Sequence, residues 1–85
     1  MRETRTITFE GSEVITIVRQ NDSFKYRTPH IQEQDNVFEF AEEAKIRGSY
    51  VFRFLVAVKK GVVDFNELED GVTLTRDDVL EMYHG

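Results

Sequence analysis

"YVFRFLVAV", residues 50–58, holds eight apolar residues and one charge, Arg53, in an acidic chain of 85 residues. Its aromatic and β-branched residues are typical of strands. Lys59-Lys60-Gly61 suits a three-residue hairpin loop with glycine in the left-handed position, after which residues 62–65 return as a short strand. We therefore predict a β-hairpin of 50–58 and 62–65.

A helix over residues 49–60 is the alternative. Ser49 would be its N-cap, and the two lysines and glycine would end it equally well. Such a helix would be apolar on every side except at Arg53, which is typical of a fully buried helix. The many residues of high strand propensity in the segment favour the hairpin.

On the hairpin interpretation, alternate residues of 50–58 point to opposite faces. The face turned away from the core then contains Val51, Arg53 and Leu55. On this face the charge of Arg53 keeps one side of an apolar strand solvated. Val51 and Leu55 would be only partly covered unless a second chain packed on that face. Self-association through Val51, Arg53 and Leu55, giving a homo-oligomeric structural subunit, is one functional hypothesis.

Three strands precede this segment. Residues 4–10, 13–20 and 24–28 alternate polar and apolar side chains, which predicts an antiparallel β-meander. Gly11-Ser12 fits a type II′ turn, which would place Phe9 opposite Val14. A three-residue loop at 21–23 would then put Phe24 and Tyr26 on the face of Val18, with Lys25 and Arg27 on the other face.

Two helices complete the predicted fold. Asn36 and Glu39 form a capping box for a helix at about 36–47, which ends at Gly48 and covers one sheet face. Thr75, followed by two aspartates, is the N-cap of a short C-terminal helix at about 76–83. We predict a single α+β domain over residues 1–85.

Composition excludes several classes of function. The chain has no cysteine, so it has no disulfide and no thiolate nucleophile or ligand. The N-terminus lacks the apolar run of a signal peptide, and no apolar stretch approaches the roughly 20 residues of a membrane span. We expect a cytoplasmic protein without a membrane association.

Catalytic motifs are also missing from the sequence. Each serine is explained by a turn or a cap, and neither histidine has an orienting carboxylate nearby in sequence. The calcium-loop pattern that begins at Asp64 fails, because Leu68 and Glu69 occupy a ligand position and the glycine position. We expect no enzymatic activity, no cofactor and no metal.

The charge distribution carries the main functional hypothesis. Residues 64–85 contain seven acids and one base, a net charge of −6, whereas residues 1–63 have ten bases and nine acids. Such an acidic surface would speed encounter with a basic protein. We therefore predict a protein-binding module, an adaptor or inhibitor, with an acidic C-terminal face made of Asp64, Glu67, Glu69, Asp70, Asp77, Asp78 and Glu81.

Single-stranded nucleic-acid binding is the remaining hypothesis. Basic side chains predicted on one sheet surface could neutralise phosphates, and nearby aromatic residues could stack on bases. The net charge of −5 disfavours this hypothesis, since phosphate neutralisation dominates such affinities. The residues concerned are Arg19, Lys25, Arg27 and Arg53.

Overall fold

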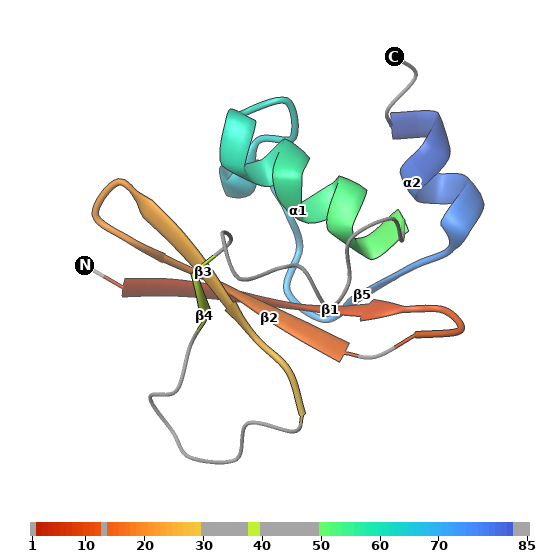
Figure 1. The fold of residues 1–85 in the computed structure, drawn as a ribbon, viewed down its shortest axis with the longest axis horizontal. Coiled ribbons are helices and arrows are strands. Elements are labelled where there is room, and N and C mark those ends of the chain that lie inside the picture. The colour runs from red at the N-terminus through yellow and green to blue at the C-terminus, as the bar shows by residue number, and fades with distance from the viewer. Residues whose placement is uncertain (1, 13, 30–37, 40–49, 83–85) are drawn as a thin grey trace.

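The computed structural model describes residues 2–12, 14–29, 38–39 and 50–82. A five-stranded mixed sheet in the order β4-β3-β2-β1-β5 has both helices on one face (Figure 1). The strands are β1 (Arg2–Phe9), β2 (Val14–Gln20), β3 (Ser23–Arg27), β4 (Phe38–Glu39) and β5 (Val72–Leu74). The helices are α1 (Tyr50–Lys60) and α2 (Arg76–Met82), with a 3-10 turn, η2 (Phe65–Glu67), between α1 and β5. This arrangement confirms the predicted α+β fold class.

The predicted meander is confirmed, but its first register is wrong by one residue. Ile7 pairs with Ile15 and Thr8 pairs with Val14, whereas the sequence predicted Phe9 opposite Val14. A slip of one residue moves every side chain of a strand to the other face. The observed register therefore places Ile15 beside Ile7 on the core face and leaves Val14 exposed.

The turns explain the registers. In the first turn, Ser12 donates its backbone N–H to the carbonyl of Phe9 at 2.9 Å, so Gly11 is the third residue of the turn rather than its second. Gly11 has φ +76°, a left-handed conformation that suits glycine. Two residues rather than three join β2 to β3, and Asn21 among them has φ 58°, which asparagine tolerates.

The side-chain faces of β3 follow from that shorter turn. Tyr26 pairs with Ile17, and Lys25 pairs with Val18. Phe24 and Tyr26 therefore lie on the core face, as predicted, but not on the face of Val18. Lys25 lies on the opposite face together with Val18.

The opening stretch is helical, so the predicted hairpin of 50–58 and 62–65 is wrong and the alternative helix is right. Four residues of α1 at helical spacing, i, i+3, i+4 and i+7, are at most 1% exposed: Val51, Phe54, Leu55 and Val58. They pack on the sheet with Ile7, Phe9, Ile15 and Ile17 in one core cluster. Tertiary burial of this stripe overrides the strand propensity of the individual residues.

The end of α1 is a Schellman motif. The N–H of Gly61 bonds the carbonyl of Val58 at 3.2 Å, and the N–H of Val62 bonds the carbonyl of Ala57 at 3.0 Å. Gly61 has φ +80°, as this motif requires. The residues taken for a hairpin loop are therefore the helix C-cap.

Two residues of the predicted helix at 36–47 belong to a strand in the structure. Phe38 and Glu39 form β4, which pairs antiparallel with β3, so the prediction is wrong at these two positions. The rest of 36–47 lies outside the described residues.

The C-terminal part contains one strand that the sequence did not predict. β5 runs parallel to β1, with Ile7 opposite Val72 and Phe9 opposite Leu74. The predicted helix at 76–83 is present as α2, with position 83 outside the described residues. Val79 of α2 is fully buried and joins the core cluster beside α1.

Candidate functional site

The most elaborate cluster of side chains surrounds Phe65. The guanidinium carbons of Arg5 and Arg19 each lie 4.5 Å from the centroid of its ring. The ring of Phe24 lies 5.6 Å from it, tilted by 58°. The registers put Arg5, Arg19 and Phe24 on the helix-bearing face of β1, β2 and β3. Phe65, 2% exposed, thus seals one end of the core against three strands.

η2 presents Phe65 to this cluster. Asp64 is the N-cap, and its Oδ1 accepts the N–H of Asn66 at 3.0 Å. Arg5 donates from Nε to the carbonyl of Leu68 at 2.9 Å, which fixes the other side of the turn. The failed calcium-loop pattern at Asp64 is therefore a capped turn with an aromatic anchor.

An ion pair joins the cluster to the surface. Arg19 donates from Nε and Nη2 to Oε1 of Glu3, at 3.0 and 2.6 Å, and from Nη2 to Oδ1 of Asn66 at 2.7 Å. The side chains of Arg19 and Glu3 are 23% and 34% exposed. Because this pair is partly solvated, its net contribution to stability is modest, about 0.2–1 kcal/mol.

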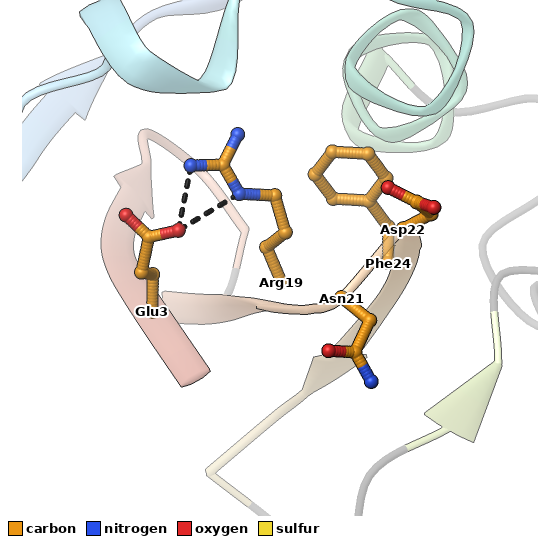
Figure 2. Close-up of a pocket in the computed structure, with 5 residues that line it drawn as sticks. All are labelled: Glu3, Arg19, Asn21, Asp22 and Phe24. Atoms are coloured by element: carbon orange, nitrogen blue, oxygen red, sulfur yellow. Dashed lines mark hydrogen bonds and ion pairs between the residues drawn. The ribbon is translucent and has the colours of Figure 1, made fainter. Parts of the chain in front are cut away.

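An open cavity of about 440 Å³ lies beside this ion pair. Figure 2 shows Arg19 between Glu3 on one side and Asp22 and Phe24 on the other, with the amide of Asn21 turned away from them. These five residues come from β1, β2, β3 and the turn between β2 and β3. The cavity thus combines two carboxylates, one guanidinium and one aromatic ring.

Local sequence gives no signal for this cavity. Glu3 and Arg19 are cross-strand partners, so the pair could have been found once the register was known. The contact of Arg19 with Asn66 spans 47 residues and depends on the placement of η2.

The predicted acidic residues divide between structure and surface. Three of them accept backbone hydrogen bonds: Asp64 caps η2, Asp78 accepts the N–H of Thr75 at 2.9 Å, and Asp70 accepts the N–H of Thr6 at 2.7 Å. The remaining four are not engaged in this way. They divide between the η2 region and α2: Glu67, Glu69, Asp77 and Glu81.

These four carboxylates are exposed or nearly so, and none makes a hydrogen bond or an ion pair within the described ranges. Arg76, at the start of α2, is the single base between residues 64 and 82. These four exposed carboxylates, two in the segment between α1 and β5 and two on α2, are together called the acidic surface below: Glu67, Glu69, Asp77 and Glu81.

The residues of the nucleic-acid hypothesis do not form one face. Arg19 lies on the helix-bearing side of the sheet and is held by Glu3, whereas Lys25 and Arg27 lie on the opposite side. Arg53 is exposed on α1. The predicted continuous basic sheet face is therefore wrong.

The predicted self-association face is also wrong in its apolar members. Val51 is 1% exposed and Leu55 is fully buried, because α1 turns both toward the sheet. Only Arg53 of the three predicted residues is on the surface.

At the other end of the core, Tyr50 connects α1 to the first turn. Its hydroxyl donates to the backbone carbonyl of Glu10, and its ring packs edge-on against Phe9. Burial raises the pKa of Tyr50 above 10, and the negative charge of Glu10 raises it further. Both effects favour the neutral phenol, which is the form that donates the hydrogen bond.

Among the described residues, no three histidine or acidic side chains are grouped so that they could hold a metal ion. In the same part of the chain, no helix has the length and apolar character needed to cross a membrane. No protein-family model matches the chain, and no curated protein or solved structure is significantly similar to it.

Proposed function

We propose that this protein is a non-enzymatic binding module, an adaptor or inhibitor in the cytoplasm, that engages a basic surface of another protein. The observation that carries the proposal is the acidic surface. Its four carboxylates have no intramolecular partner in the described ranges, so their charge is available to a ligand. A partner that supplies lysines and arginines would give these carboxylates the counterions that they lack within the described ranges.

The structure narrows the set of residues that a test should change. Asp64, Asp70 and Asp78 accept backbone hydrogen bonds, so neutralising them would change stability as well as charge. The four members of the acidic surface carry no such bond. Their replacement by amides is expected to leave the fold intact.

The experiment compares capture of partners from host extract by the wild-type chain and by a variant with Glu67→Gln, Glu69→Gln, Asp77→Asn and Glu81→Gln. A basic protein retained by the wild type should lose at least tenfold in affinity for the variant, as measured by titration calorimetry with the purified pair. Glu81→Gln alone should also weaken binding, and its matched single-charge control is Glu10→Gln, which neutralises an exposed acid outside the acidic surface and should leave the affinity unchanged. Equal affinity of the quadruple variant and the wild type would refute the proposal.

A converse variant strengthens the test. Arg76→Gln removes the single base among residues 64–82 and should increase affinity for the same partner. A partner that binds Arg76→Gln more weakly would contradict an electrostatic role of this surface.

A further inference from the structure

The C-terminal end of α1 is basic. Lys59 and Lys60 are exposed, and neither makes a hydrogen bond or an ion pair within the described ranges. Arg53, seven residues before Lys60, lies on the same side of the helix and also has no such partner in the described part of the chain. Val62 follows the C-cap glycine and is 64% exposed. This end of the helix thus combines positive charge with one apolar side chain, and it is called the basic end below: Lys59, Lys60 and Val62.

The helix α2 carries the opposite charge. Its three acids are exposed, and Met82 is 46% exposed. At about 100° per residue, the three acids and Met82 lie side by side within an arc of about 140° around the helix. The buried Val79, which packs in the core, lies outside this arc. The arc is called the α2 face: Asp77, Asp78, Glu81 and Met82.

The basic end and the α2 face lie at opposite ends of the helical layer. In Figure 1, α1 starts beside α2 and runs away from it, so its C-terminal end is the part of the helix farthest from α2. Within the described residues, no ion pair joins Lys59 or Lys60 to α2. A positive and a negative surface that do not meet in one molecule are free to meet between two copies of it.

The apolar residues favour a second copy over other anionic ligands. Three large apolar side chains are exposed in the part of the chain that the structure describes, and two of them, Val62 and Met82, lie one in each surface. A phosphate group would satisfy the lysines but would leave Val62 in water. The α2 face offers carboxylates for the lysines and an adaptable apolar side chain, Met82, for Val62.

We propose that copies of this protein associate head to tail, with the basic end of one copy on the α2 face of the next. Because the two surfaces differ, the contact is heterologous and builds linear assemblies rather than a closed two-fold dimer. The inference goes beyond the proposed function and does not rest on it. Asp77 and Glu81 belong to both surfaces, so a basic partner and the next copy compete for them.

The association is weak and depends on salt. Its ion pairs are few and exposed, which gives a dissociation constant on the order of 1 mM at low salt. Screening at physiological salt should weaken it further. Nuclear magnetic resonance of the full chain is suited to this range of affinity, because amide shifts at different protein concentrations report both the affinity and the residues in contact.

The test mixes two variants. Lys59→Gln with Lys60→Gln neutralises the basic end and keeps the α2 face, whereas Asp77→Asn with Glu81→Gln does the reverse. Each variant alone should associate about tenfold more weakly than the wild type at low salt. An equimolar mixture should form dimers, because the intact α2 face of the first variant binds the intact basic end of the second. With only the first variant isotopically labelled, shifts should fall on residues 76–82, and with only the second labelled, on residues 59–62.

A matched control separates this contact from an effect of net charge. Asp22→Asn removes one exposed acid from the turn between β2 and β3 and should leave the association unchanged, whereas Asp77→Asn should weaken it about two- to threefold. A mixture that associates no more than its two components would overturn the head-to-tail contact. So would undiminished association of the lysine variant alone, or wild-type shifts that stay constant between dilute and millimolar solution at low salt. These outcomes do not involve another protein, so the proposed function keeps its own separate test.

Discussion

At the scale of single residues, Phe65 joins packing and charge. Its ring is buried, yet two arginines, one on each of two neighbouring strands, reach it from the sheet. The guanidinium group of each arginine lies over the ring and also donates a hydrogen bond, from Arg5 to the carbonyl of Leu68 and from Arg19 to Glu3. The sequence could not indicate this cluster, because the contacts of Arg5 and Arg19 with η2 depend on how the chain returns to the sheet after α1.

Arg53, the one charge in the opening stretch, is exposed, whereas its neighbour Phe54 is fully buried. Phe54→Ala should lower the free energy of unfolding by about 3–5 kcal/mol, because it leaves a cavity among core residues. Arg53→Ala should change it by less than about 0.5 kcal/mol. Urea denaturation of the two variants measures both values. A cost for Phe52→Ala, which removes a half-buried ring, equal to that of Phe54→Ala would contradict the helical assignment of faces.

Tyr50 gives a prediction for alkaline pH. Its folded pKa is raised above the value near 10 of the unfolded chain, first by burial and then by Glu10. The stability that the neutral phenol contributes is therefore fully present below pH 10 and is lost as the pH rises through the folded pKa. Tyr50→Phe should lower stability at neutral pH and flatten its decline above pH 10.

Denaturation midpoints of Tyr50→Phe and wild type across this pH range provide the measurement. The ultraviolet absorbance of phenolate reports the titration of tyrosines in the folded chain. In the variant, the tyrosine that ionises at a raised pKa should be missing from this titration. Identical pH profiles of the two proteins would rule out the assigned role of Tyr50.

At the scale of elements, the strands and the helix α1 show what sequence patterns can and cannot predict. Period-two alternation located β1, β2 and β3 correctly, because alternate residues of each strand face the core beneath the helices, although Val18 of β2 is also buried on the opposite face. The predicted pairing register of these strands was wrong, because the register depends on the conformation of two short turns. In these turns Gly11 and Asn21 have positive φ, at positions that the sequence composition does not specify.

The strand prediction for the segment that forms α1 was wrong for a different reason. Val51, Phe54, Leu55 and Val58 have helical spacing, but the residues between them are also apolar or aromatic, which hides that period. β5, with three residues, is too short to give a periodic signal of its own.

The short helix α2 depends on its N-terminal capping box. Thr75 Oγ1 accepts the N–H of Asp78 at 3.0 Å, and Asp78 accepts the N–H of Thr75 at 2.9 Å. Thr75→Ala should cost about 0.5–2 kcal/mol of stability. Thr75→Ser, which keeps the hydroxyl, is the matched control and should cost much less. Thermal denaturation of the two variants decides, and equal costs would show that the hydroxyl is not the cap.

At the scale of the whole molecule, the uneven charge distribution governs encounter with a partner. The acidic surface belongs to a segment with net charge −6, whereas the rest of the chain is nearly neutral. Association with the basic partner should therefore slow steeply as salt rises from low to physiological concentration, where the screening length falls to about 8 Å.

Stopped-flow kinetics of wild type and the quadruple amide variant measure this dependence. The variant should associate more slowly at low salt and show a shallower salt dependence, with dissociation less affected. A wild-type association rate that does not change with salt would exclude electrostatic steering by the acidic surface.

The parallel pairing of β5 with β1 has a consequence for how the protein is made. The second edge of β1 is completed by late residues: Leu68 accepts from Arg5, Asp70 accepts from Thr6, and Glu10 donates to Leu74. Because a ribosome releases the N-terminus first, the meander emerges while these partners are still untranslated. Until α1 and β5 have been synthesised, Ile7 and Phe9 lie on an open strand edge, where α1 does not yet cover them and β5 does not yet pair with β1. The sheet closes only after β5 has been synthesised, so this fold is completed well after the meander has emerged.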